Sequence, residues 1–239
     1  MIKEKKIRLC LIPGVFCDES LFEETVLFLN KEISSSIYTI NSPRSIKEAA
    51  ISLDAKIGQP SFILGFSLGG WVAQEYAYRY PHKTKGLILV STTKDTVSAE
   101  TKKAMVLACN KLETIPLSEM ISSLTESYFD KSVDNIVTEK FSSMAQSVGA
   151  SSAINQYQII LKQNEPVGGP DRSNIPTLIL RGGCDKRNPP ETQEKLKDQF
   201  THAKLASIPN AGHFIPLEQP KVLAEIINAY LMNYTDETA

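Results

Sequence analysis

The 239-residue sequence contains no long apolar run, and no stretch of it is apolar enough to span a membrane. Its first apolar run, Ile7 to Ile12, is ended by Pro13 and Gly14 and is too short for the apolar core of a signal peptide. We therefore expect a cytoplasmic protein with no membrane partner.

Basic tracts are also missing. The chain has 26 Lys and Arg against 27 Asp and Glu, and its formal net charge is −1. Proteins that bind nucleic acid need a basic surface to neutralise phosphates. The composition therefore gives no support to a nucleic-acid partner, and we expect none.

The sequence has only four cysteines, and none of them is spaced as in a C-x-x-C motif. They are Cys10, Cys17, Cys109 and Cys184. This scatter favours free thiols in a reducing compartment over disulfides or a zinc site. No metal and no cofactor is predicted. Cys17 and Cys184 lie close to the loops in which we place the active site below, but we favour a packing role over a nucleophilic one for both.

Short apolar strands alternate with amphipathic helices along most of the chain. A hydrophobic content of 42% over this length is enough for one core, so we predict a single α/β domain over residues 1–239. The alternation predicts a mostly parallel sheet of about six strands with helices on both faces. The predicted strands are Ile7 to Ile12, Ile37 to Ile40, Phe62 to Phe66, Leu87 to Val90, Thr177 to Leu180 and Lys204 to Ile208.

Helix signals complete this pattern. Capping boxes at Ser20 to Glu23 and Ser45 to Glu48 predict two helix starts. From about residue 95 to 174 no strand is predicted, and apolar residues recur at helical spacing in four sets. A helical insertion between two strands is typical of a cap over an active site. Plain helical packing on the sheet is the alternative, and the sequence does not separate the two.

The segment from Phe62 to Tyr80 carries the most informative motif. Gly65-Phe66-Ser67-Leu68-Gly69 matches G-x-S-x-G, in which a serine stands on a sharp turn between a strand and a helix. Such a turn exposes the serine hydroxyl. It also puts the main-chain N–H of Leu68 at a helix N-terminus, where a developing negative charge is stabilised. The short pattern also occurs by chance, so its meaning depends on finding a base and an acid.

A base for Ser67 must come from three histidines. His82 and His202 lie at or after helix ends, and we expect both on the surface. His213 follows a predicted strand in a glycine-containing loop, at the edge of a parallel sheet where ligands gather. Asp185 follows the preceding strand and reaches the same edge. The chain order is therefore serine, acid, histidine.

Together these motifs resemble those of the α/β-hydrolase superfamily, in which the catalytic residues follow that order. The similarity is greatest to the small, capped, carboxylesterase-like members, including esterases that cleave the methyl ester of pimeloyl-acyl carrier protein. It covers essentially the whole chain. The landmarks are the Pro13-Gly14 loop, the elbow with its extra Gly70, the G-x-x-D-x-x-x-P pattern from Gly182 to Pro189, and Gly212-His213 before a helix.

The chain also departs from these relatives. Pro13 stands where most of them have His, and Asn41 to Arg44 replaces an acidic, glycine-rich loop. The sequence begins at what is usually the third strand, so we expect the leading antiparallel strands to be absent. The change at Pro13 leaves the main-chain N–H groups of Val15 and Leu68 in place, but we expect it to alter how the loop around Val15 is braced.

The resemblance implies a serine mechanism. Ser67 would be the nucleophile, His213 the general base and then the general acid, and Asp185 the group that orients the imidazole. The main-chain N–H groups of Val15 and Leu68 would form the oxyanion hole. Each side chain also has a structural alternative: Ser67 in a packing turn, Asp185 as a turn former, and His213 as a buried structural histidine.

The implied function is hydrolysis of a small or medium carboxylic ester through an acyl-enzyme, and the substrate is a small molecule, either free or bound to a carrier. A thioesterase, a perhydrolase or a carbon–carbon hydrolase would use the same residues, and a ligand-binding protein would keep the scaffold without turnover. Trp71, Tyr128 and Phe129 are candidate pocket walls, with core or cap packing as their alternative. The sequence suits a monomer or a homodimer.

Overall fold

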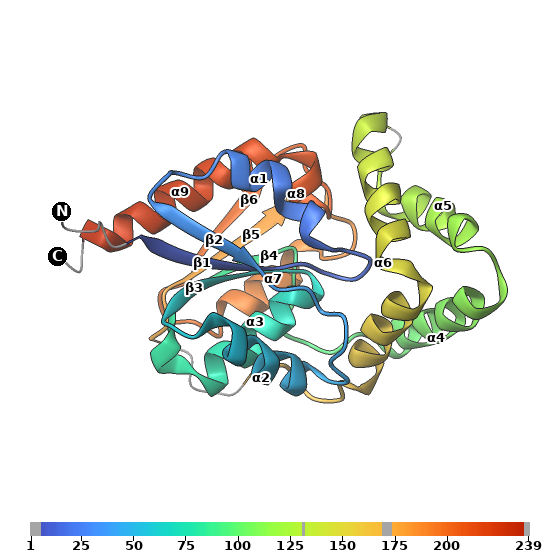
Figure 1. Cartoon of the computed structure of the whole chain (residues 1–239), viewed down its shortest axis with the longest axis horizontal. Coiled ribbons are helices and arrows are strands. Elements are labelled where there is room, and N and C mark those ends of the chain that lie inside the picture. The colour runs from blue at the N-terminus through green and yellow to red at the C-terminus, as the bar shows by residue number, and fades with distance from the viewer. Residues whose placement is uncertain (1–5, 131, 169–173, 237–239) are drawn as a thin grey trace.

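The computed structural model describes residues 6–130, 132–168 and 174–236, and a six-stranded, all-parallel sheet lies at its centre (Figure 1). The predicted α/β architecture is therefore confirmed. The first five and last three residues of the predicted domain lie outside the described part. The strands are β1 (Ile7–Ile12), β2 (Ile33–Ile37), β3 (Ser61–Phe66), β4 (Thr84–Val90), β5 (Thr177–Gly182) and β6 (Lys204–Ile208), in the order β2-β1-β3-β4-β5-β6.

The edge strand β2 differs from the sequence prediction. The strand spans Ile33–Ile37, whereas apolar content placed it over Ile37 to Ile40. Its middle is three serines, and it pairs only with β1, through a register that runs from Ile7↔Ile33 to Leu11↔Ile37. An edge strand is covered less completely than a central one, so it needs fewer apolar residues. Tyr38 and Ile40, which suggested the wrong range, are buried just beyond the strand.

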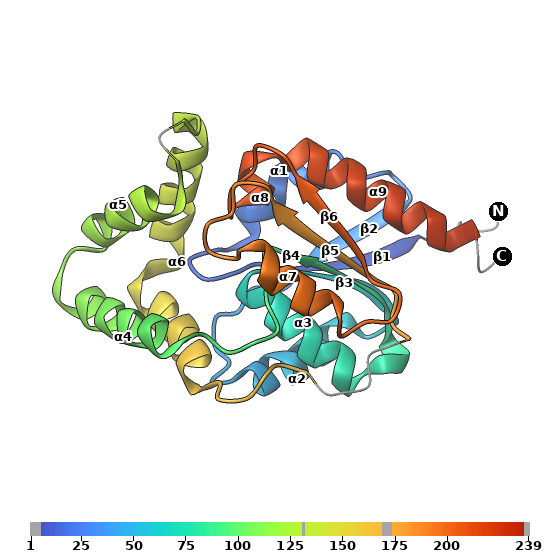
Figure 2. The same cartoon turned by 180° about the vertical axis from the view of Figure 1, so that it is seen from behind.

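Helices cover both faces of the sheet. Helices α1, α8 and α9 lie on one face, and α2, α3 and α7 lie on the other (Figures 1 and 2). The bounds of these helices are α1 (Glu23–Leu27), α2 (Ile46–Ile57), α3 (Leu68–Arg79), α7 (Pro190–Lys197), α8 (Ile215–Glu218) and α9 (Pro220–Asp236), with short 3-10 helices at Glu19–Phe22 and Pro81–Lys83. The apolar core lies between these layers and the central strands.

Of the two predicted capping boxes, one forms in part: Ser45 caps its helix, but Glu48 bonds back to the N–H of Arg44 and not to that of Ser45. Ser45 Oγ accepts the main-chain N–H of Glu48 at 3.1 Å, and Glu48 Oε2 accepts the N–H of Arg44 at 2.8 Å. The prediction at Ser20 is wrong: Ser20 lies inside a 3-10 helix whose N-terminus is capped by Asp18, and Asp18 Oδ1 accepts the N–H of Ser20 at 2.9 Å. Asp accepts such bonds as well as Ser does, so the pattern alone leaves the start uncertain by two residues.

Three helices form the insertion between β4 and β5: α4 (Ala99–Thr114), α5 (Leu117–Tyr128) and α6 (Asn135–Lys162). They lie to one side of the sheet, beyond the ends of the strands (Figure 1). The last two apolar sets predicted in the sequence both fall in α6, which is broken at Gly149 by a φ of 77°. Within the described ranges, no helix is both long and apolar enough to cross a bilayer.

Helix α3 packs directly against the end of β1 at Gly69. A Cβ atom added to Gly69 would lie 2.1 Å from the carbonyl oxygen of Ile12 and 2.7 Å from that of Pro13. Main-chain atoms cannot move aside as a flexible side chain does. This contact therefore fixes the distance between the first strand and the helix that follows β3.

We predict that Gly69→Ala lowers the free energy of unfolding by about 3 kcal/mol or more, because the added methyl overlaps main-chain atoms of β1. Gly58→Ala is the matched control: its φ is 63°, and no atom lies within 4 Å of the added methyl. Gly58→Ala should lower the free energy of unfolding by only about 1–2 kcal/mol, which is what a left-handed backbone costs an alanine. Urea denaturation measures both. Equal losses would show that the close approach at Gly69 is not a constraint.

Candidate active site

The turn between β3 and α3 holds Ser67 in an unusual conformation. Ser67 has φ 51° and ψ −116°, a region that non-glycine residues rarely adopt. Neighbouring contacts maintain it: the Ser67 carbonyl accepts the N–H of Gly70 at 2.9 Å and the hydroxyl of Thr92 at 2.7 Å. A Cβ atom at Gly65 would lie 2.3 Å from the Gly69 oxygen, so the turn closes only without a side chain there.

Three side chains meet at this turn in a chain of hydrogen-bonding contacts. His213 Nε2 lies 3.3 Å from Ser67 Oγ, and His213 Nδ1 lies 3.0 Å from Asp185 Oδ2. Asp185 follows β5 and His213 follows β6, so both come from loops at the same edge of the sheet as Ser67. The other two histidines, His82 and His202, are exposed. The structure therefore brings together the three residues that the sequence singles out.

Asp185 is held in its charged form. Burial alone would raise the pKa of its carboxyl, but the hydrogen bond and charge of His213, together with the N–H groups of Asn188 and Arg187, outweigh burial and lower that pKa. These N–H groups donate to Asp185 Oδ1 at 3.1 and 2.9 Å. A carboxylate on Nδ1 favours the tautomer that carries its proton there, which leaves Nε2 free to accept the proton of Ser67.

Glu218 holds the loop that carries His213. Its carboxylate accepts the main-chain N–H of Gly212 at 2.6 Å and of Phe214 at 2.9 Å, the two residues that flank the histidine. Burial raises the pKa of Glu218, while the two N–H groups counteract part of that effect. No motif in the sequence marks Glu218 for this role. Its contacts restrict the main chain on both sides of His213.

Two main-chain N–H groups remain open beside Ser67. Leu68 is the first residue of α3, so its N–H has no acceptor within the helix. Val15 lies in the loop after β1, outside any helix or strand. Across the described ranges, neither N–H donates a hydrogen bond to another protein group. Both residues line the same cavity as Ser67.

We call this space the elbow cavity; it has a volume of about 520 Å³. Its walls include Ser67, Trp71 and Tyr128, together with apolar side chains from the inserted helices. Besides Tyr128, the apolar lining residues from α4, α5 and α6 are Ala104, Met105, Ala108, Met120, Leu124, Tyr157 and Ile160. Trp71 and Tyr128 therefore lie where the sequence predicted a pocket wall. Phe129 does not line the elbow cavity.

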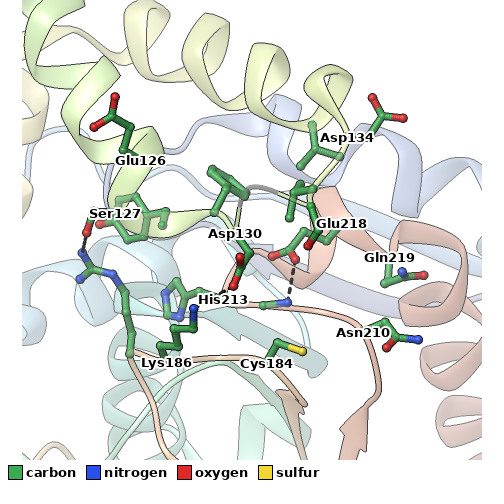
Figure 3. A pocket seen from close by; sticks show the side chains of 17 residues that line it. Glu126, Ser127, Asp130, Asp134, Cys184, Lys186, Asn210, His213, Glu218 and Gln219 are labelled. Carbon is green, nitrogen blue, oxygen red and sulfur yellow. Dashed lines mark hydrogen bonds and ion pairs between the residues drawn. The ribbon is translucent and has the colours of Figure 1, made fainter.

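A second space, the polar cavity of about 580 Å³, is also lined by His213 (Figure 3). Phe129 is on its wall, and Asp130 and Lys186 form an ion pair there at 2.7 Å. Tyr128 lies between the two cavities, with its ring stacked on that of His213 at a centroid distance of 6.1 Å. The Arg187 guanidinium lies over the Tyr128 ring, 3.9 Å from its centroid.

The cysteines do not form a competing nucleophilic centre. Cys17 is fully buried and donates to the carbonyl of Val15 at 3.2 Å, and burial raises the pKa of its thiol strongly. A neutral thiol is a poor nucleophile. Cys184 is exposed on the polar cavity. Among residues 6–130, 132–168 and 174–236, no group of three His, Cys, Asp or Glu side chains is placed to hold a metal ion.

Comparison with known sequences gives one family over most of the chain. Residues 30–220 match the family described as alpha/beta hydrolase fold. A pimeloyl-[acyl-carrier protein] methyl ester esterase from Neisseria meningitidis serogroup A is 24% identical over 82% of this chain and 64% of its own length. An sn-1-specific diacylglycerol lipase from Mus musculus is 22% identical over 72% of this chain and 59% of its own. The chain thus spans less than two thirds of either relative.

Solved structures share the fold over nearly the whole chain. A thermophilic esterase from Thermogutta terrifontis aligns with a TM-score of 0.83 and 21% identity, covering 96% of this chain and 90% of that one. An enol-lactonase from Burkholderia xenovorans gives the same TM-score at 15% identity, with 95% and 92% coverage. At such low identity the similarity extends to the fold alone.

The lowered pKa of Asp185 gives a pH-dependent prediction. A carboxyl whose pKa is lower in the folded state stabilises the fold above its unfolded pKa, about 3.9, and this contribution is lost as pH falls through the folded value. The stability of wild type relative to Asp185→Asn should therefore decrease as pH falls from 6 towards 3. Urea denaturation across that range measures it. A difference that stays flat across that range would contradict the assignment.

Proposed function

The chain belongs to the α/β-hydrolase fold family, and on that premise we propose that it is a serine esterase that cleaves a small or medium carboxylic ester through an acyl-enzyme. The observation that carries this proposal is the contact of His213 with Ser67 on one ring nitrogen and with buried Asp185 on the other. A serine on a strained turn, beside a base that a carboxylate orients, is the arrangement that nucleophilic catalysis requires.

In the first half of the reaction, Ser67 Oγ attacks the ester carbonyl carbon while His213 Nε2 takes the hydroxyl proton. The carbonyl oxygen becomes an oxyanion, which the main-chain N–H groups of Val15 and Leu68 stabilise. One such donor is typically worth about 3–4 kcal/mol of transition-state stabilisation. The tetrahedral intermediate then collapses, the bond to the alcohol oxygen breaks, and His213 gives its proton to the departing alcohol.

In the second half, water replaces the alcohol. His213 takes a proton from the water as its oxygen attacks the acyl carbon, and a second oxyanion forms at the same two N–H groups. Collapse releases the carboxylic acid and returns the proton to Ser67 Oγ. Asp185 stays ionised throughout and stabilises the imidazolium that forms in each half.

The elbow cavity supports an apolar acyl group of limited size. Its volume of about 520 Å³ lies within the usual range of small-molecule sites, and most of the side chains that the inserted helices contribute are apolar. In this proposal residues 95–174 act as the cap that sets the acyl pocket, and Trp71 and Tyr128 bind the substrate. The esterase and lipase names of the sequence relatives agree with an ester as substrate.

We predict that Ser67→Ala lowers kcat for a p-nitrophenyl ester by at least about 10⁴-fold, because the nucleophile is lost. A fluorophosphonate should label wild type at Ser67 and leave the variant unlabelled, as peptide mass spectrometry would show. Ser61→Ala is the matched control. Ser61 is the buried first residue of β3, the strand that leads to Ser67. Among the described residues, its hydroxyl bonds only to the carbonyl of Gln59.

Activity should survive in Ser61→Ala. Tight binding of an ester without turnover, unchanged in Ser67→Ala, would instead favour a ligand-binding protein on this scaffold. Acyl-thioesters of matched chain length belong in the same panel, since a thioesterase would use the same three residues.

The pocket assignment predicts a chain-length effect. Across p-nitrophenyl esters from acetate to palmitate, kcat/KM should peak at short or medium chains, since a cavity of about 520 Å³ limits the size of the acyl group. Met120→Phe adds bulk to that wall and should move the optimum to a shorter chain. Val106→Phe changes an exposed position on α4 outside the wall and should leave the optimum in place. An unchanged optimum in Met120→Phe would place the acyl group elsewhere.

A further inference from the structure

Gln156 connects three distant parts of the chain inside the core. It lies on α6, is fully buried, and takes no part in the contacts among Ser67, His213 and Asp185. Its Oε1 accepts the main-chain N–H of Phe16 at 2.9 Å, and its Nε2 donates to the carbonyl of Ile40 at 3.2 Å. One amide thus joins the insertion to the loop after β1 and to the segment after β2.

The loop after β1 is packed against the elbow. A Cβ atom at Gly14 would lie 3.0 Å from Cβ of Ser67 and 3.1 Å from the Phe66 ring. The next residue is Val15, which lines the elbow cavity and whose N–H donates to no protein group among the described residues. On its other side Phe16 has φ 61°, a left-handed conformation that costs an ordinary residue about 1–2 kcal/mol. Such a conformation persists only when surrounding contacts determine it.

Gln156 supplies the polar part of those contacts. Its bond fixes the Phe16 N–H, and the Phe16 ring meets Tyr157 edge-on at a centroid distance of 5.8 Å. Val15 is therefore held between Gly14, which lies against Ser67, and Phe16, which is tied to α6. The amide thus fixes the peptide unit between Val15 and Phe16, which is the neighbour of the unit that carries the Val15 N–H.

We propose that Gln156 is a positioning residue that holds the N–H of Val15 towards the oxyanion and so couples the cap to the chemical step. This inference rests on the function proposed above. Gln156 does not line the elbow cavity, so it acts through the loop and not on the substrate. A primary amide suits the place because it accepts from Phe16 and donates to Ile40 at once, which neither an apolar nor an ionised side chain does.

The test compares two neighbours on the same helix. Gln156→Met keeps the side-chain shape and removes both hydrogen bonds. Asn155→Leu removes bonds from α6 to the carbonyls of Asn41 and Pro43, in the same segment that Gln156 reaches. Among the described residues, no hydrogen bond joins the Asn155 side chain to the loop after β1. Both variants are assayed with one p-nitrophenyl ester and by thermal unfolding.

Removing an oxyanion donor altogether lowers kcat by about 10²–10³-fold. A donor that is only displaced should have a smaller effect, so we expect Gln156→Met to lower kcat by about 10- to 100-fold with KM nearly unchanged. Asn155→Leu should keep kcat within about threefold of wild type, since no oxyanion donor moves. A trifluoromethyl ketone adds a readout: Ser67 Oγ bonds to its carbonyl carbon, the hydroxyl proton passes to His213, and the oxygen becomes an anion. Its affinity should fall in parallel with kcat/KM.

Gln156→Glu covers the case in which the Met variant does not fold. A protonated carboxylic acid accepts and donates as the amide does, whereas the carboxylate only accepts. The ratio of variant to wild-type kcat should therefore rise as pH is lowered. A kcat ratio for Gln156→Glu that does not change with pH would refute the positioning role. So would a Gln156→Met variant that keeps the kcat of wild type or loses no more of it than Asn155→Leu does. Either result would leave the proposed esterase function intact. A wild type that neither hydrolyses esters nor reacts with a fluorophosphonate would overturn the proposed function, and this inference with it.

Discussion

The turn at Ser67 is the constraint around which the site is built. Its backbone lies in a strained region, and a strained turn persists only where the structure around it leaves no alternative. That surrounding structure comes from several elements. The main chain of α3 at Gly69 packs against the end of β1, and the hydroxyl of Thr92, just after β4, donates to the Ser67 carbonyl. The position of the serine hydroxyl is thus a property of the parallel sheet as a whole.

The sheet also explains why the other two side chains arrive at the same place. All six strands run parallel, so the loops that follow β3, β5 and β6 emerge at one edge. Asp185 and His213 are nearly buried there, 7% and 6% exposed, and a buried carboxylate is costly unless it is hydrogen-bonded. Asp185 meets that demand with the imidazole and two main-chain N–H groups. Its contacts hold the histidine in one tautomer while they stabilise the charge.

Much of this arrangement could be predicted from the sequence, because the relevant signals are local. Ser67 stands in a five-residue motif, and His213 follows a strand in a short glycine-containing loop. The edge strand Ile33–Ile37 was misplaced because its serines give no apolar signal. Glu218 and Gln156 were missed for another reason: a glutamate near a helix start and a glutamine within a helix are common, and only the fold shows which backbone groups they bond.

Helix α6 joins two properties that are usually discussed separately. Tyr157 and Ile160 are on the wall of the elbow cavity, while Gln156 reaches past that wall to the loop beside Ser67. A shift of this helix that reshapes the cavity must therefore also pull on the N–H of Phe16. In the proposed esterase, the size of the acyl pocket and the geometry of the oxyanion donors are then not independent variables. Changes in the cap that alter which ester fits should change the rate of the chemical step as well, because one rigid element carries both.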